Sequence, residues 1–189
     1  RDLVVDTGSR HYLKLSAAYP ANKKLILPTS ITAADFGLSG RTIHQRIAMP
    51  ELTLGSIVLN EVKTNLIPSD DEDDWWVIGN ALLNQFILTI DYPSNTLYLT
   101  PVQPFKSRFN LIGLELRKIR SGEFVVRYVL PGLPAAKADF KEGDLITEIN
   151  GIKAINISLD QALDIANTST NTSANTSANT GETRTRAEF

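Results

Sequence analysis

Three consecutive residues, Asp6, Thr7 and Gly8, could carry catalytic chemistry because they directly follow the apolar run Leu3-Val4-Val5. Aspartyl proteolysis needs two carboxylates that share one proton. The ionised carboxylate activates a water molecule, and the protonated one acts as acid toward the scissile carbonyl. Asp6 would hang at the end of a buried strand, Thr7 would brace the loop, and Gly8 would let the backbone turn without a Cβ. Taken alone, the tripeptide is also typical of a surface turn.

A second segment supports the catalytic interpretation. Val77-Ile78-Gly79 follows about seventy residues later and leads into helical spacing over Asn80 to Phe86 and an apolar run over Ile87 to Tyr92. In this order and spacing, the two segments resemble the retropepsin-like aspartic protease family, from Arg1 to about Pro101. The resemblance implies an acid-protease β-barrel in which the Ile-Gly segment passes beneath the catalytic loop.

The resemblance also assigns roles to individual residues. The catalytic turn consists of Asp6, Thr7 and Gly8, and the supporting residues are Ser9, Ile78 and Gly79. The hydroxyl of Ser9 is expected to donate a hydrogen bond to the carboxylate. Donation to the charged form would lower the pKa at which the catalytic pair takes up a proton.

A lid over the substrate is expected between the two motifs. Phe36-Gly37-Leu38-Ser39-Gly40 is the best candidate for the tip of this flap, with Gly37, Ser39 and Gly40 as the flap residues. Two glycines within four residues would give the mobility that such a lid needs. An ordinary glycine loop is the alternative.

The chain contains one Asp-Thr-Gly, whereas pepsin-like enzymes carry two. Retropepsins carry one per chain and dimerise, so the resemblance implies a homodimer that brings two Asp6 carboxylates together about a two-fold axis. Two features depart from the family. The strand that normally precedes the catalytic strand is missing, and Asn80 and Ala81 stand where viral members carry a charged residue. The chain starts at Arg1, which we interpret as trimming or truncation, and its own dimerisation and activity stay open.

A second set of motifs begins near Phe109. Pro134-Ala135-Ala136-Lys137-Ala138, then Gly143-Asp144-Leu145-Ile146, then Ile149-Asn150-Gly151 resemble bacterial-type PDZ domains. The segment Ile112, Gly113, Leu114, Glu115 and Leu116 matches the carboxylate-binding loop of that family. The resemblance implies that backbone N–H groups there hold a peptide's terminal carboxylate, while the peptide adds as a strand beside Leu114. A small β domain without a ligand is the alternative.

The pattern of elements predicts a mainly β chain, and the two resemblances imply a retropepsin-like barrel with one half-site followed by a PDZ-like α+β domain. The predicted organisation is 1–101 for the protease-like domain, 108–166 for the PDZ domain, 167–180 for a low-complexity tail, and 181–189 for a last strand or tail. From Asn167 the composition collapses to Asn, Thr, Ser and Ala, which predicts disorder because little apolar surface can be buried.

Composition excludes several classes of function. There are no cysteines, so thiol catalysis and cysteine–metal sites are excluded, and His11 and His44 lack metal-ligand spacing. The formal net charge is -2, which argues against nucleic acid as a partner. No apolar run is long enough to span a bilayer. The acidic run from Asp70 to Asp74 is best interpreted as a solvated loop. No metal or cofactor is expected.

The function expected from these motifs is that of an aspartic-type endopeptidase, active as a homodimer, whose PDZ domain recruits a peptide or protein substrate. The alternative is a non-catalytic dimerising scaffold whose PDZ domain binds protein C-termini, either alone or within a larger processing complex. PDZ-linked proteases are often found in the bacterial envelope, so the resemblance favours a periplasmic or envelope location. The sequence does not give the substrate.

Overall fold

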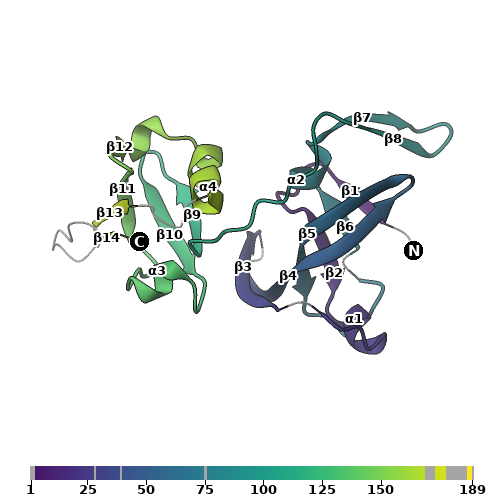
Figure 1. Cartoon of the computed structure of the whole chain (residues 1–189), viewed down its shortest axis with the longest axis horizontal. Helices are drawn as coiled ribbons and strands as arrows, with labels where there is room; N and C mark the ends of the chain where they lie inside the picture. Colours follow the sequence, from purple (N-terminus) through teal and green to yellow (C-terminus); the bar gives the residue numbers. More distant parts are fainter. Residues whose placement is uncertain are drawn as a thin grey trace. The chain divides into compact units, whose positions relative to one another are not determined.

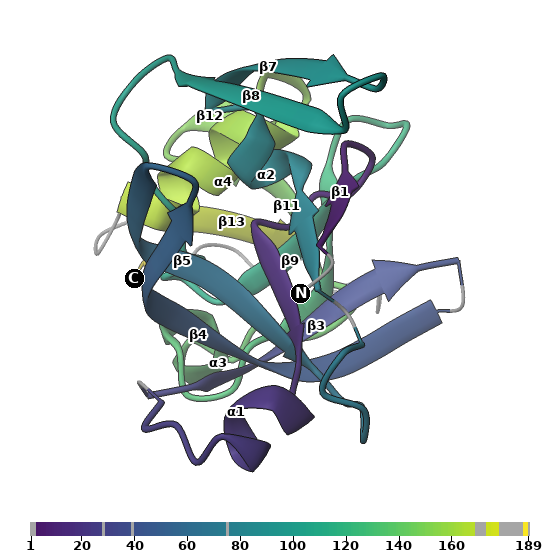
Figure 2. The ribbon, with the colours of Figure 1, turned by 90° about the vertical axis from the view of Figure 1, so that its right-hand side faces the viewer.

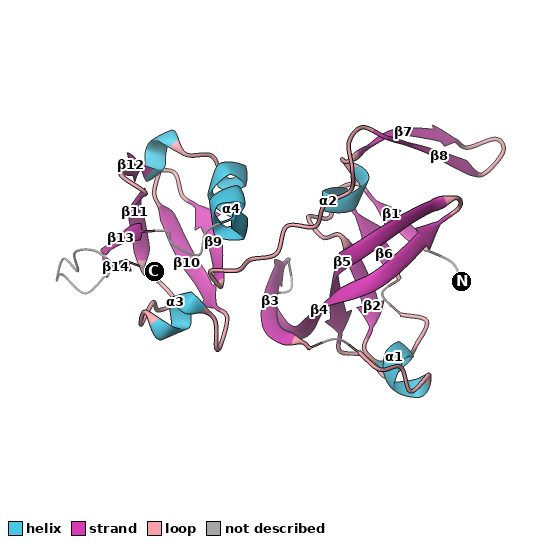
Figure 3. Ribbon diagram, in the orientation of Figure 1, coloured by secondary structure: helices cyan, strands magenta, loops and turns pink. Residues whose placement is uncertain are grey.

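The computed structural model describes residues 3–27, 29–38, 40–74, 76–168, 173–177 and 187–188. It is mainly β and divides into two compact units, Arg1–Ser107 and Arg108–Phe189. Figures 1 and 3 show a sheet in each unit, with short helices and loops between the strands.

The first unit is built on a six-stranded sheet with the order β1-β6-β2-β5-β4-β3. Two neighbouring pairs are parallel, β1 with β6 and β2 with β5, and the others are antiparallel. The strands are β1 (Val4–Asp6), β2 (Leu13–Ser16), β3 (Ile31–Gly37), β4 (Gly40–Leu54), β5 (Ile57–Ile67) and β6 (Val77–Gly79). Two one-turn helices, α1 (Ala18–Asn22) and α2 (Asn80–Leu83), follow β2 and β6.

Two consecutive hairpins form the long part of this sheet (Figure 2). β3 and β4 join at a tight turn, where Gly37 pairs with Gly40, and β4 and β5 join at Gly55-Ser56. Gly55 has a φ of +59°, a left-handed conformation that favours glycine. Apolar side chains from the sheet and α2 form one core, and burying each large one fully contributes about 1.5–3 kcal/mol. Its most buried members are Leu13, Leu15, Ile47, Leu59, Val62, Ile78, Leu82 and Leu83.

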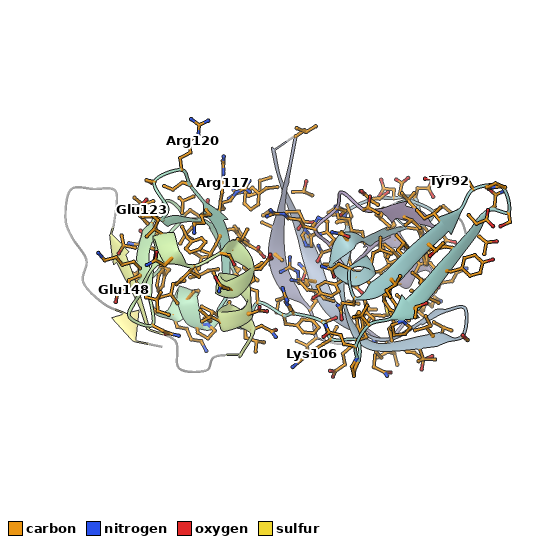
Figure 4. The ribbon with its side chains drawn as sticks, turned by 90° about the horizontal axis from the view of Figure 1, so that it is seen from above. Tyr92, Lys106, Arg117, Arg120, Glu123 and Glu148 are labelled. Carbon is orange, nitrogen blue, oxygen red and sulfur yellow. The ribbon has the colours of Figure 1, made fainter. Side chains whose placement is uncertain are left out.

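A separate two-stranded hairpin, β7 (Phe86–Asp91) with β8 (Thr96–Pro101), completes the first unit. One face, with Phe86, Leu88 and Leu99, packs on the core. Tyr92 at the turn end is exposed, and its side chain points outward (Figure 4).

The first unit extends past β8 because the following segment is hydrogen-bonded to it. The backbone N–H of Lys106 donates to Gln85 Oε1 at 2.9 Å, and Gln85 Nε2 donates to the carbonyl of Lys106 at 3.1 Å. The hydroxyl of Ser107 accepts from the N–H of Lys63 at 2.9 Å. The boundary between the units therefore falls after Ser107.

The second unit contains a sheet with the order β14-β13-β11-β10-β9, and β12 also pairs with β11. The strands are β9 (Leu114–Lys118), β10 (Phe124–Val129), β11 (Leu145–Ile149), β12 (Ile152–Lys153), β13 (Ser173–Ser177) and β14 (Ala187–Glu188). The helices are α3 (Pro134–Lys137), a 3-10 turn at Ala154–Asn156, and α4 (Leu159–Thr168). Phe124, Val126 and Ile146 are almost fully buried at the centre of a second core.

Part of the low-complexity segment is ordered. Residues 173–177 form β13, which pairs antiparallel with β11, so the composition-based prediction of disorder is wrong for these five residues. A strand can be held by backbone hydrogen bonds alone, which do not require apolar side chains. Ala187–Glu188 forms β14 beside β13, within the segment predicted as a last strand or tail. Residues 169–172, 178–186 and 189 lie outside the described residues.

Candidate functional site

The predicted catalytic turn follows β1 directly. Asp6 ends the strand, and its Oδ1 accepts hydrogen bonds from the backbone N–H groups of Gly8 at 2.9 Å and Ser9 at 3.1 Å. The carbonyl of Asp6 also accepts from the Ser9 N–H at 3.3 Å. No described residue donates to the other carboxylate oxygen, Oδ2. The turn therefore fixes the orientation of the carboxylate through one oxygen and leaves the other available.

The strand β6 brings the second predicted motif beside this turn. β1 and β6 pair in parallel register, with Val5 opposite Ile78 and Asp6 opposite Gly79. The N–H of Asn80 donates to the carbonyl of Ser9 at 2.7 Å, which ties the start of α2 to the turn. A Cβ at residue 79 would lie 2.3 Å from the carbonyl oxygen of His11, so only glycine fits there.

Two residues just before this turn are more exposed than the sequence predicted. Val4 and Val5 were expected to be buried, but they are 60% and 39% exposed. The reason is that β1 is an edge strand with β6 as its one neighbour in the described sheet. Thr7 and Gly8 are also exposed. Ser9 contacts Asp6 through its backbone N–H and not, as predicted, through its hydroxyl, whose oxygen accepts from the N–H of His11 at 3.5 Å.

The predicted flap residues lie at the turn of the β3–β4 hairpin. Gly37 ends β3, Gly40 begins β4, and Leu38 between them is fully exposed. Gly40 has a φ of +101°, which a residue with a side chain rarely adopts. Ser39 lies outside the described residues.

A polar cluster that the motifs did not indicate lies in the same sheet, around Asp35. The strand register explains it: Lys14 on β2, Asn65 on β5 and Arg46 on β4 are paired neighbours across three strands. The side chain of Asp35 is 14% exposed. Its carboxylate lies within 4 Å of four basic side chains: His11 at 3.4 Å, His44 at 3.8 Å, Lys14 at 3.9 Å and Arg46 at 3.9 Å.

Asn65 connects the cluster and sets the proton position on one histidine. Its Nδ2 lies 3.1 Å from Asp35 Oδ2 and 3.1 Å from His11 Nδ1, while its Oδ1 accepts from Arg46 Nε at 2.9 Å. Because an amide nitrogen only donates, His11 Nδ1 must accept, and its Nε2 carries the proton toward Asp35. His11 is therefore neutral in this arrangement.

Burial keeps both histidines of the cluster neutral. Desolvation lowers the pKa of His11 to about 4, and the charges of Lys14 and Arg46 add to this, whereas Asp35 opposes it. Burial also lowers the pKa of His44, again against the opposing charge of Asp35. Neither ring nitrogen of His44 has a hydrogen-bond partner in the described part of the chain.

In the second unit, the predicted peptide-binding segment forms the edge of the sheet. β9, which includes Leu114, Glu115 and Leu116, has β10 as its one neighbour in the described sheet, so its other side is open. Helix α4 lies beside β9 (Figures 1 and 3). The loop before β9 is fastened to this helix, since the N–H of Leu111 donates to the carbonyl of Ala166 at 3.2 Å.

Two of the N–H groups that were predicted to hold a carboxylate already have a partner. Asn110 Oδ1 accepts from the N–H of Gly113 at 2.9 Å and from that of Leu114 at 3.2 Å. Asn110 Nδ2 donates to the carbonyl of Leu114 at 2.6 Å. No described residue accepts a hydrogen bond from the N–H of Ile112, the first residue of the predicted loop.

A family model described as PDZ domain matches residues 103–173. The chain contains a PDZ domain, most of which lies in the second unit. The match covers the edge strand, the loop before it and α4. A comparison with curated proteins found no match for the chain.

Within the PDZ domain, a lysine at the end of β9 supports the edge strand. Lys118 Nζ donates to the carbonyls of Ala154, Ile155 and Ile157, around the 3-10 turn. Its ammonium also lies 5.4 Å from the centre of the Phe124 ring. Neighbouring Arg117 is exposed and points outward (Figure 4). Lys118 thus stabilises β9, whereas Arg117 is free to meet solvent or a ligand.

The described residues include neither a metal-binding cluster nor a membrane-spanning helix. No group of three or more His, Cys, Asp or Glu side chains there is placed to hold a metal ion. No helix in the described part of the chain has both the length and the apolar content to cross a membrane.

Proposed function

We propose that this chain binds an extended peptide at the open side of β9 in its PDZ domain. The observation that carries the proposal is that β9 is an edge strand beside α4 in the segment that matches the PDZ family. An extended peptide can add to such an edge by backbone hydrogen bonds, and side chains at alternate positions then provide specificity. A peptide-binding or scaffold role follows from the domain itself.

Peptide titration followed by NMR tests this proposal. Chemical-shift changes should centre on 114–118 and 159–168, the residues of β9 and α4. The opposite side of the sheet, at Ile152–Lys153, is an internal control and should not shift. Changes centred on that opposite side, or no changes across a broad set of sequences, would contradict peptide binding at β9.

A second candidate function is that of an aspartic endopeptidase, with Asp6 as half of a catalytic pair. Three observations favour it: the two N–H donors to Asp6 Oδ1, the parallel pairing of Asp6 with Gly79, and the absence of room for a side chain at residue 79. In this function two chains bring their Asp6 carboxylates together around one water molecule. One carboxylate takes a proton from the water, which attacks the scissile carbonyl, and the other donates its proton to the carbonyl oxygen.

This peptidase requires a homodimer, because each chain supplies one Asp-Thr-Gly. Exposure of Thr7 and Gly8 agrees with a turn that meets a second copy. Peptidase activity per chain should then rise with protein concentration until the dimer is saturated. Full activity in a species that sedimentation shows to be monomeric would rule out the shared site. A dimer that binds peptide but cleaves none would favour the non-catalytic scaffold.

A further inference from the structure

The side-chain amide of Asn110 makes the hydrogen bonds that a bound peptide would make to the first residue of β9. It accepts from the N–H of Leu114 and donates to the carbonyl of the same residue. A peptide strand added to a sheet edge makes this same pair of contacts. Asn110 is 7% exposed, so the contacts are sheltered from water.

The strand pairing shows that these two groups of Leu114 face the open side of β9. Leu114 lies opposite Val129 in the antiparallel pair, and the N–H of Leu130 donates to the carbonyl of Gly113 at 2.9 Å. That bond flanks a non-hydrogen-bonded pair, in which the N–H and carbonyl of Leu114 point away from β10. Backbone groups alternate in direction along a strand, so Leu116 presents the next N–H and carbonyl on the open side.

We propose that Asn110 occupies the place of a peptide's terminal carboxylate, so that this PDZ domain takes internal segments of extended peptides instead of free C-termini. This inference rests on the proposed peptide-binding function. Along β9, the first backbone contact open to a ligand is at Leu116, and the ligand chain can continue past Asn110.

A peptide carboxylate would gain too few hydrogen bonds from the N–H groups of this loop to displace Asn110. Two of the three N–H groups of the loop, those of Gly113 and Leu114, converge on Asn110 Oδ1. The third, that of Ile112, is the one left for a ligand. A carboxylate would have to replace both bonds to Oδ1 and leave the amide nitrogen without the carbonyl of Leu114, and a buried polar group without a partner is unfavourable.

Matched peptides test the inference. Short peptides that bind the domain are prepared with a free C-terminal carboxylate, with an amidated C-terminus, and with extra residues beyond the same C-terminus. For the wild-type domain, all three forms should bind within about twofold of one another, and the Leu116 amide signal should shift more than that of Gly113. A free-carboxylate form at least about tenfold tighter than the amide, a difference of about 1.4 kcal/mol, would overturn the inference and leave peptide binding intact.

Asn110→Ala provides the complementary measurement. Removing the amide frees the N–H groups of Gly113 and Leu114, so the variant should favour the free carboxylate over the amide by at least about tenfold. Asn156→Ala is the matched control, because Asn156 is exposed in the same domain, and it should behave as wild type. Equal affinity for both forms in folded Asn110→Ala would overturn the inference. If Asn110→Ala does not fold, the wild-type comparison still decides. Absence of binding by any peptide to either protein would overturn the proposed function itself.

Discussion

The turn at Asp6 and the loop at Asn110 use the same local device with opposite results. In each, one side-chain oxygen accepts from two consecutive backbone N–H groups a few residues later in the chain, and a glycine is one of the donors. Asp6 is at an exposed turn, and its second oxygen has no donor among the described residues. Asn110 is buried, and its second polar atom is bound to Leu114. The Asp6 turn leaves one carboxylate oxygen available for reaction, whereas the Asn110 loop occupies the backbone groups at the start of the β9 edge.

The largest expected effect concerns the group that Asp6 presents. Asp6→Asn keeps an oxygen that can accept from Gly8 and Ser9, so the fold should survive, but it removes the acid–base function. Peptidase activity of the dimer should fall by at least about 10²–10⁴-fold. The measurement is the kcat/KM of purified protein on a cleaved peptide. Asp70→Asn is the matched control, because it makes the same charge change at an exposed loop residue.

Activity that persists in Asp6→Asn while the dimer is intact would exclude Asp6 as half of a catalytic pair. The Asp6 turn and the Asn110 loop would then both be purely structural, and the scaffold function would be favoured. Loss of activity in Asp70→Asn as well would show that the peptidase activity depends on the net charge of the first unit and not on the carboxylate of Asp6.

The next effect concerns the strand that supports the Asp6 turn. In Gly79→Ala the new Cβ would overlap the carbonyl of His11, so β6 has to move, at a cost of about 3 kcal/mol in the free energy of unfolding. Gly37→Ala is the control, because a Cβ there meets no atom within 4 Å, and it should change stability by less than about 0.5 kcal/mol. Both tryptophans, Trp75 and Trp76, belong to the first unit, so fluorescence during urea unfolding reports on it. Equal stability of the two variants would contradict this packing.

The sequence predicted those features that depend on short local patterns. Asp6-Thr7-Gly8 and Val77-Ile78-Gly79 were assigned to one site, and the structure pairs the strand that ends at Asp6 with the second segment, with Asp6 opposite Gly79. The tight turns at Gly55-Ser56 and Asn150-Gly151 also follow from local chemistry, and the PDZ motifs identified a domain that the family comparison supports.

The features that depend on distant pairing could not be predicted in this way. The Asp35 cluster combines residues of four strands with His11, and their contact follows from strand register, which the separate motifs do not contain. Val4 and Val5 are exposed because β1 is an edge strand. Apolar composition alone does not distinguish an edge strand from a central strand, so the sequence did not predict this exposure. The contact of Asn110 with its own loop depends on the orientation of the Asn110 side chain, which the motifs do not specify. β13 forms by backbone pairing, which composition does not report.

The Asp35 cluster gives the first unit a pH dependence that the Asn110 loop lacks. The pKa of His11 is 6.5 in the unfolded chain and about 4 in the folded protein, so between these values the unfolded state binds more protons. Stability is therefore fully present above about pH 6.5 and falls as the pH drops toward 4, by at most about 3 kcal/mol. His44, whose pKa is also lowered, acts in the same direction.

Urea unfolding of the first unit at a series of pH values measures this effect. His11→Gln, which does not titrate, should flatten the slope of unfolding free energy between pH 6.5 and 4. Asp35→Asn should make the slope steeper, because Asp35 is the group that favours protonated His11. An identical slope in wild type and His11→Gln would show that His11 does not carry the pH dependence.

The smallest expected effect concerns stability, and it compares the Asp6 turn with the Asn110 loop directly, since each accepting side chain is replaced by alanine. Asn110→Ala leaves the N–H groups of Gly113 and Leu114 and the carbonyl of Leu114 without their partner at a buried position. This should destabilise the PDZ domain by about 1–3 kcal/mol. Asp6→Ala also removes an acceptor from two N–H groups, but water can reach the exposed turn and replace it, so the cost should stay below about 1 kcal/mol. Amide hydrogen exchange measured by NMR reports on each unit separately and can rank the two losses. If Asp6→Ala destabilises its unit as much as Asn110→Ala does, the two oxygens are equally structural, and the openness of the Asp6 turn does not distinguish it from the closed loop.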